Sequence, residues 1–133
     1  MTTGGVLDEL IVYLRSQLSS TWTTSNSFIT RMPDEPDNCL TLYEYTGHDE
    51  YHLGQDHPSY QIVRVQASVR SLSYATARTN LMAVKSKLES VSGALSGVNY
   101  LRVYSTSTIT RLELDQQDRE ILVLNFEVYK EES

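Results

Sequence analysis

The chain has 133 residues, of which 40% are hydrophobic and 21% charged, a composition typical of one soluble globular domain over residues 1–133. Seventeen acidic and eleven basic residues give a net charge of −6, which argues against tight DNA or RNA binding because that needs a basic footprint. A single cysteine excludes an internal disulfide, and no segment reaches the roughly 18 apolar residues that a bilayer span requires.

The first expected element is an amphipathic helix over residues 6–18. Apolar residues recur there at spacings of three and four. Asp8 and Glu9 lie in the first turn, where the helix dipole favours acidic side chains. A polar run over residues 19–26 ends the helix, and Trp22 within it is expected to anchor this connection to the core.

A proline-rich turn separates two short expected strands. Residues 27–32 and 38–45 have the composition of strands. Pro33 and Pro36 interrupt the chain between them, because proline lacks an amide donor and fixes φ. This spacing predicts an antiparallel hairpin. Residues 46–59, rich in glycine, proline, histidine and acids, are expected to form a long loop.

The clearest unit is a strand followed by a helix over residues 60–93. In its first part, four apolar residues alternate with four polar ones, and these are Val63, Val65, Ala67 and Val69 against Arg64, Gln66, Ser68 and Arg70. This period of two predicts a strand with one apolar face. The period then changes to that of a helix, with Ser73 as its expected N-cap and Gly93 as the residue that ends it.

Further strands complete the expected fold. Residues 98–107 form one strand, which 108–114 continue or kink, and residues 119–130 form the last one. The order of elements predicts an α+β domain with a mainly antiparallel sheet and two helices packed on one face.

Two strand faces are candidates for contact with another subunit. The second face of the 119–130 strand is too apolar to lie in water, so either a neighbouring element or another subunit covers it. The polar face of the 60–70 strand is either solvated or a subunit contact. The candidates are Arg64, Gln66, Arg70, Val123, Asn125 and Tyr129.

Catalytic and metal-binding patterns are weak. His48, His52 and His57 lie among acids, and imidazole with carboxylate can bind zinc or manganese, but their spacing matches no established motif. A solvated loop is therefore favoured, and a metal-dependent enzyme is the alternative. The acids of the 33–37 turn are expected to be solvated rather than paired for catalysis. No nucleophile elbow or phosphate loop occurs, so we predict no catalytic residue and no cofactor.

Several stretches of the chain follow one another in a pattern that a known family shares. They are Met32–Asp37, Leu40–Gly47, Val65–Arg70, Ser73–Ala77, Leu114–Asp115 before Asp118–Arg119, and Val123–Val128. In this order, after an N-terminal amphipathic helix, they resemble the small minor capsid or tail-terminator proteins of long-tailed bacteriophages. The resemblance covers residues 6–129.

The resemblance implies a structural role in the virion, at the head-proximal end of the tail, after synthesis in the host cytoplasm. A hexameric ring of such proteins caps the tail tube, ends its polymerisation and offers the surface that joins the head. The implied partners are further copies, the tail tube protein and a head-completion protein, without a membrane, while DNA passes without specific binding. A head-closure or other head–tail connector protein is the alternative.

The resemblance also gives a second set of contact candidates. It implies that the 33–37 hairpin and the 47–58 loop point toward neighbouring rings or the channel. The residues concerned are Asp34, Glu35, Asp37, Asp49 and Glu50.

Overall fold

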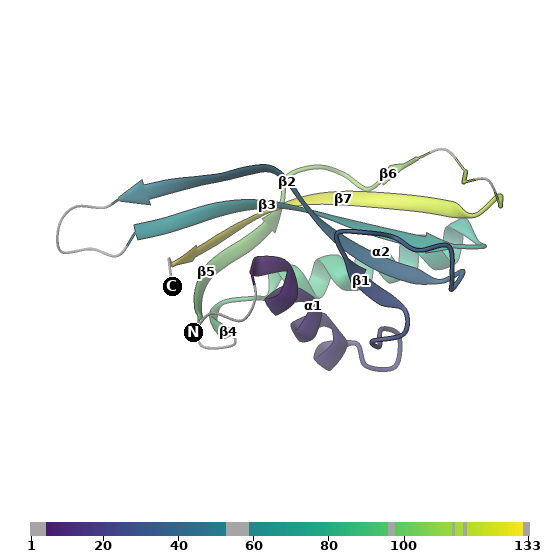
Figure 1. Cartoon of the computed structure of the whole chain (residues 1–133), viewed down its shortest axis with the longest axis horizontal. Coiled ribbons are helices and arrows are strands. Elements are labelled where there is room, and N and C mark those ends of the chain that lie inside the picture. The colour runs from purple at the N-terminus through teal and green to yellow at the C-terminus, as the bar shows by residue number, and fades with distance from the viewer. Residues whose placement is uncertain (1–4, 53–58, 96–97, 113, 116, 132–133) are drawn as a thin grey trace.

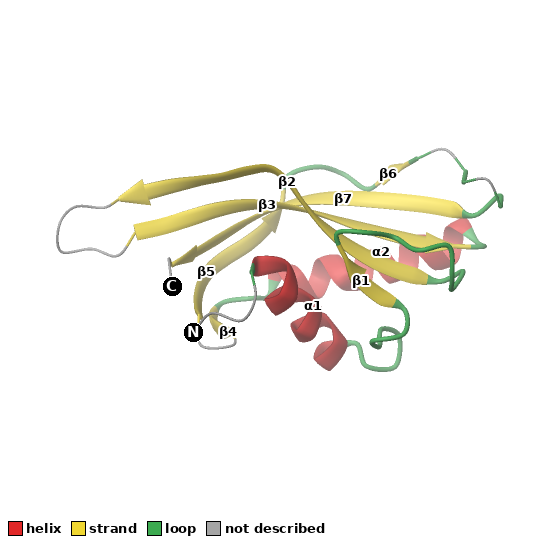
Figure 2. Cartoon of the chain, viewed as in Figure 1, coloured by secondary structure: helices red, strands yellow, loops and turns green. Residues whose placement is uncertain are grey.

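One sheet with two helices on one face makes up the computed structural model (Figure 1, Figure 2). It describes residues 5–52, 59–95, 98–112, 114–115 and 117–131, and only the backbone of 46–52, 59–60, 94–95 and 98. The elements are α1 (Val6–Gln17), β1 (Ser27–Ile29), β2 (Cys39–His52), β3 (Ser59–Ser71), α2 (Tyr74–Glu89), β4 (Gly93–Leu95), β5 (Val98–Ser105), β6 (Thr110–Arg111) and β7 (Glu120–Glu131). The predicted α+β class is confirmed.

The strand order is β1-β2-β3-β7-β5-β4, with β6 also paired to β7. β1 and β2 are parallel, and the other pairs that the structure describes are antiparallel. β3 and β7 lie at the centre and pair from Tyr60 with Glu131 to Ser71 with Glu120 without a shift. β5 and β6 follow one another along the far edge of β7.

The core lies between the helices and one face of the sheet, as the apolar periodicities predict. α1 buries Leu10 and Leu14 completely, and α2 does the same with Leu81 and Leu88. The sheet contributes the alternate residues of its central strands, and these are Leu40, Leu42, Val63, Val65, Ala67, Val69, Leu122, Leu124, Phe126 and Val128. Trp22 is 1% exposed and is part of the same cluster, so the predicted anchor between α1 and β1 is confirmed.

A buried polar contact joins α1 to the C-terminal strand. The hydroxyl of Tyr100 on β5 donates to Glu9 Oε1, and Lys130 Nζ on β7 lies 3.7 Å from the same oxygen. The three residues are 1, 8 and 5% exposed. Burial raises the pKa of Tyr100, and the hydrogen bond to Glu9 raises it further, so the hydroxyl stays protonated and donates at neutral pH.

The second helix begins where predicted and ends earlier. Ser73 is the N-cap, and its Oγ accepts the Thr76 amide at 3.4 Å. The helix ends at Glu89 with Ser90 as C-cap, and Gly93, with φ of +86°, begins β4 instead of ending the helix. Among the residues that the structure describes, no helix is long and apolar enough to cross a membrane.

The predicted antiparallel hairpin over residues 27–45 is wrong. β1 runs parallel to β2, with Phe28 beside Thr41. Parallel neighbours cannot be joined by a tight turn, so residues 30–38 return to the starting end of the pair. Thr30, with φ of +66°, begins this connection immediately after β1.

The predicted loop over residues 46–59 is also largely strand. β2 continues to His52 and β3 begins at Ser59, with His48 paired to Val63 and His52 to Ser59. The register shifts between Glu44 and His48, so the strand resumes after an irregularity in its glycine-containing part. β2 and β3 thus form an arm that projects beyond the helices (Figure 1).

We expect Tyr100→Phe to lower the free energy of unfolding by about 1–3 kcal/mol, because a buried carboxylate loses its donor. Chemical denaturation measures this change. Tyr13→Phe is the matched control, since the Tyr13 hydroxyl makes an exposed 3.2 Å contact with Ser90 Oγ. Equal stability of the two variants would show that the Glu9 contact contributes nothing.

Candidate assembly surface

The face of the sheet away from the helices, hereafter the outer face, carries most of the predicted contact residues. The β3–β7 register places Arg64 beside Glu127, Gln66 beside Asn125 and Arg70 beside Ile121. These side chains project from alternate positions of two adjacent strands, so the alternation in the sequence brings them together. The structure divides this face into an uncovered half and a covered half.

The uncovered half holds a tyrosine–glutamate cluster, formed by Arg64, Arg102, Tyr104, Glu127 and Tyr129. Glu127 is its centre. Its Oε1 accepts hydrogen bonds from the hydroxyls of Tyr104 at 2.6 Å and Tyr129 at 3.2 Å. Its Oε2 lies 3.4 Å from Arg64 Nε. The two tyrosine rings stack with centroids 5.7 Å apart, and the Arg102 guanidinium lies 4.5 Å from the Tyr104 centroid.

This cluster is ordered but remains open to solvent. Arg64, Tyr104, Glu127 and Tyr129 are half-buried and Arg102 is exposed. The hydrogen bond to Glu127 raises the pKa of Tyr104, so its hydroxyl stays protonated. Next to the cluster, Gln66 Nε2 donates to Asn125 Oδ1 at 3.1 Å. Aromatic and arginine side chains held in one conformation are the groups that contribute most to protein–protein contacts.

The covered half is buried within the subunit. Arg70 and Val123, both predicted as contact candidates, are 3 and 6% exposed. The 30–38 connection lies over Arg70, whose Nη2 donates to Pro36 O at 2.6 Å and whose Nε donates to Asp37 O at 3.4 Å. Ser68 is also buried, and the guanidinium of Arg70 can lie in the interior because its partners come from this connection rather than from water.

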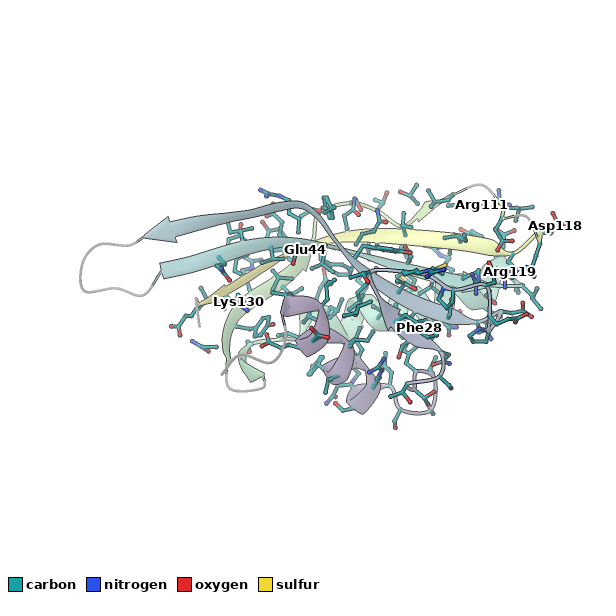
Figure 3. The ribbon with its side chains drawn as sticks, viewed as in Figure 1. Phe28, Glu44, Arg111, Asp118, Arg119 and Lys130 are labelled. Carbon is teal, nitrogen blue, oxygen red and sulfur yellow. The ribbon has the colours of Figure 1, made fainter. Side chains whose placement is uncertain are left out.

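A second buried arginine fixes the same connection. Arg119, 2% exposed, donates from Nη1 to Asp34 O at 2.6 Å and to Asp37 Oδ1 at 3.2 Å. Its Nε donates to Asp115 Oδ2 at 2.8 Å. Burial lowers the pKa of Arg119, but Asp115 and Asp37 outweigh that effect and raise it. Arg119 lies at one end of the sheet, with Arg111 and Asp118 (Figure 3).

The predicted acidic contacts separate into two groups. Asp37 uses its carboxylate internally, whereas the side chains of Asp34 and Glu35 are exposed. Asp49 and Glu50 lie in β2 opposite Ile62 and Gln61, where the backbone alone is described.

The three histidines do not lie together in one described loop. His48 and His52 belong to β2, and His57 lies outside the described residues. Among side chains that the structure describes, no group of three or more His, Cys, Asp or Glu residues could hold a metal ion.

Sequence reasoning missed three residues of the outer face and its connection. Tyr104 and Arg102 reach this face because β5 shifts register between Tyr100 and Arg102, which reverses the alternation there. Arg119 was predicted only as the first residue of the last strand, with no role of its own. The spacing of Asp115 and Arg119, four residues apart, was the one signal that could have suggested their ion pair.

The comparisons with known proteins agree with this architecture. A family model described as bacteriophage tail terminator protein matches residues 13–132. The chain belongs to the bacteriophage tail terminator family. No curated protein matches the chain. A solved chain from the virion of a native gene transfer agent particle shares the fold, with a TM-score of 0.69 and 17% identity over 97% of this chain and 96% of that one.

Membership of the tail terminator family confirms the resemblance seen in the sequence. Two of the stretches that carried it, Met32–Asp37 and Leu114–Arg119, are far apart in the chain. Arg119 joins them in the structure through Asp115, Asp34 and Asp37. In this chain the two stretches thus form one unit, because Asp34 and Asp37 of the first accept hydrogen bonds from an arginine of the second.

Arg119→Leu should release the 30–38 connection. Hydrogen bonds to a charged donor are lost, so we expect amide exchange in residues 30–38 to accelerate about tenfold or more. Hydrogen–deuterium exchange measures this directly. The control is Arg111→Leu, since the 52% exposed Arg111 also donates twice to a carboxylate, that of Glu120 at 2.6 and 3.0 Å, but makes no described hydrogen bond to residues 30–38. Unchanged exchange in Arg119→Leu would contradict the anchoring role.

Asp115 makes the stability of this region acid-sensitive. Partial burial raises the pKa of its carboxyl, but the amides of Arg119 and Gln117 and the Arg119 guanidinium outweigh that and hold it below 3.8. Because the folded pKa is depressed, the contribution is complete above the unfolded pKa and is lost as pH falls through the folded value. The free energy of unfolding of the wild type should therefore fall with acidification below about pH 4.

Asp115→Asn should be less stable than the wild type at pH 7 and lose less stability on acidification. Urea denaturation at a series of pH values tests both points. The control is Asp118→Asn, whose exposed carboxylate makes no hydrogen bond or ion pair with the described chain. If both variants follow the wild-type pH dependence, Asp115 is not the acid-sensitive group.

Proposed function

We propose that this protein is a structural subunit of the phage virion whose ring caps the tail tube, ends its polymerisation and provides the surface that joins the head. Family membership over residues 13–132 carries this proposal. The solved chain with the same fold comes from a virion, which supports the same location. The role is one of assembly and requires no catalytic step or cofactor.

The outer face supports assembly in physical terms. A ring needs each subunit to present a preformed surface that becomes buried. The tyrosine–glutamate cluster has fixed side chains, since each of its two tyrosine hydroxyls already donates to Glu127. Little side-chain entropy would be lost when another subunit covers it. We infer that Arg64, Gln66, Asn125 and Tyr129 contact a neighbouring subunit, while Arg70 and Val123 support that surface from within.

The remaining partners follow from the same role. The exposed Asp34 and Glu35, and Asp49 and Glu50 of the arm, are candidates for contact with other copies of the chain, in the same or an adjacent ring, or with the tube. The net charge of −6 repels the phosphate backbone, so DNA would pass through the ring without specific binding. A hexamer is the expected ring, with the tail tube protein on one side and a head-completion protein on the other.

Electron microscopy of purified protein mixed with growing tail tubes tests the role. We expect rings in the protein alone, density at one end of each tube, and tubes that stop lengthening. Tubes that grow unchanged and carry no density would contradict the proposal. Localisation beside the portal instead of the tube would favour the head-closure alternative.

Tyr129→Arg should abolish ring formation and capping while leaving the fold intact. A new charge would have to be buried between subunits, and the stack on Tyr104 would be lost. Light scattering after size-exclusion chromatography should show monomers at concentrations where the wild type is assembled. Val12→Arg is the control, because Val12 is 55% exposed on α1, away from the outer face. Rings that persist in Tyr129→Arg would remove this face from the interface.

A further inference from the structure

Exposed apolar side chains occur just before α2, along α2 and after β6. Leu72, Tyr74, Met82 and Leu112 are 65, 45, 46 and 45% exposed. Tyr74 and Met82 belong to α2, Leu72 lies just before it, and Leu112 follows β6. The exposed Tyr74 and Met82 make this side of α2 a candidate for contact with another molecule.

A groove of about 410 Å³ runs between α2 and the chain that links β5 to β6. Its lining includes Arg78, Met82 and Lys85 from α2, Ser107 and Ile109 from the linking chain, and the core residue Leu124. One wall is fixed by Glu89, which binds Lys85 Nζ at 2.8 Å and accepts the Ser105 amide at 3.1 Å and its hydroxyl at 2.8 Å. The charge of Lys85 is therefore neutralised within the subunit.

Arg78 is the charged group of this groove that has no partner. It is exposed on α2, between Tyr74 and Met82 at helical spacing, and makes no hydrogen bond or ion pair with the part of the chain that the structure describes. An unneutralised guanidinium beside apolar side chains favours a ligand that combines a carboxylate with apolar or proline surface.

The 30–38 connection of this same chain has that chemistry. Asp34 and Glu35 are exposed, and their carboxylates make no hydrogen bond or ion pair with the described residues. Met32, Pro33 and Pro36 lie around them, half-buried. Because Arg70 and Arg119 already hold the connection in place, its backbone would lose little conformational entropy on binding.

We propose that the α2 groove of one subunit receives residues 32–37 of a second copy, with Arg78 facing Asp34 and Glu35. The inference rests on the proposed ring. The connection is bound to the outer face through Arg70, whereas α2 packs on the opposite face. Two different surfaces on opposite sides of a subunit form a head-to-tail contact, which generates a ring when the rotation between successive copies closes. Every copy of the chain carries both the groove with Arg78 and the acidic connection. Two copies can therefore form the contact without another protein.

Charge reversal tests this contact. Arg78→Glu and the double change Asp34→Lys with Glu35→Lys should each weaken self-association about tenfold or more, because like charges then face each other. Analytical ultracentrifugation gives the association constants. Combining all three changes in one chain should restore the ring, since the pair is then reversed rather than broken. Lys87→Glu, on α2 but outside the groove, is the control and should assemble as the wild type does.

A mixing experiment gives an independent readout. When Arg78→Glu protein is mixed with the Asp34→Lys, Glu35→Lys protein, every contact in an alternating ring pairs opposite charges. Rings should therefore form from two proteins that are each monomeric, provided the ring has an even number of subunits. Thermal unfolding of each variant, expected within a few degrees of the wild type because all three sites are exposed, excludes misfolding as the cause of any monomer.

The outcomes separate this inference from the proposed function. If Arg78→Glu and the double change Asp34→Lys with Glu35→Lys each form rings as the wild type does, the groove contact is overturned and the proposed ring is not. Rings that form in all variants but no longer bind tail tubes would assign the groove to the tube protein and also overturn the inference. A wild type that never self-associates would overturn both.

Discussion

The structure depends on the unbroken pairing of β3 with β7. Because side chains alternate between faces, this register decides at once which residues of two central strands meet the helices and which meet the outside. It places Val65 beside Phe126 under α2, and Gln66 beside Asn125 on the outer face. A slip of one residue would bury Arg64 and Gln66 against the core and expose the apolar residues that close it.

The two ends of the outer face differ in how far the chain itself covers them. At one end, two buried arginines donate to carbonyl groups of the 30–38 connection and hold it over the sheet. At the other end, Glu127 organises two tyrosines and an arginine without covering them. The two ends of the outer face thus present different surfaces, one a half-buried tyrosine–glutamate cluster and the other a fixed connection with exposed carboxylates.

Local periodicity was sufficient to predict the helices, the central strands and the α+β class. The alternation of Val63 to Val69 and the helical spacing of Ala77 to Leu88 reflect which side chains are buried in the core. Both patterns are local, so they can be read from the sequence. The parallel pairing of β1 was not predictable in the same way. It depends on Arg70 and Arg119 binding carbonyl groups of residues 34–37, and a contact over such a sequence separation has no local pattern.

The candidate surface was predictable in part for the same reason. Alternation placed Arg64, Gln66, Asn125 and Tyr129 on one face, as the structure has them. It could not tell that Arg70 and Val123 on that face are covered by the chain itself, or that a shift in β5 brings Tyr104 there. Strand periodicity predicts on which face of the sheet a side chain lies. Whether that side chain is exposed depends on which connections cover the face.

The contact between Glu89 and Ser105 has a consequence for the solubility of unassembled subunits. The amide of Ser105 in β5 donates to this carboxylate, and the hydrogen bond from Lys85 lowers the pKa of Glu89 so that it stays an acceptor. A strand from another chain that approached β5 here would have to displace a charged side chain before it could pair. Charged groups at a strand edge are a known protection against fibrous aggregation. The contact with Glu89 thus makes this position of β5 a poor template for the strand of another chain.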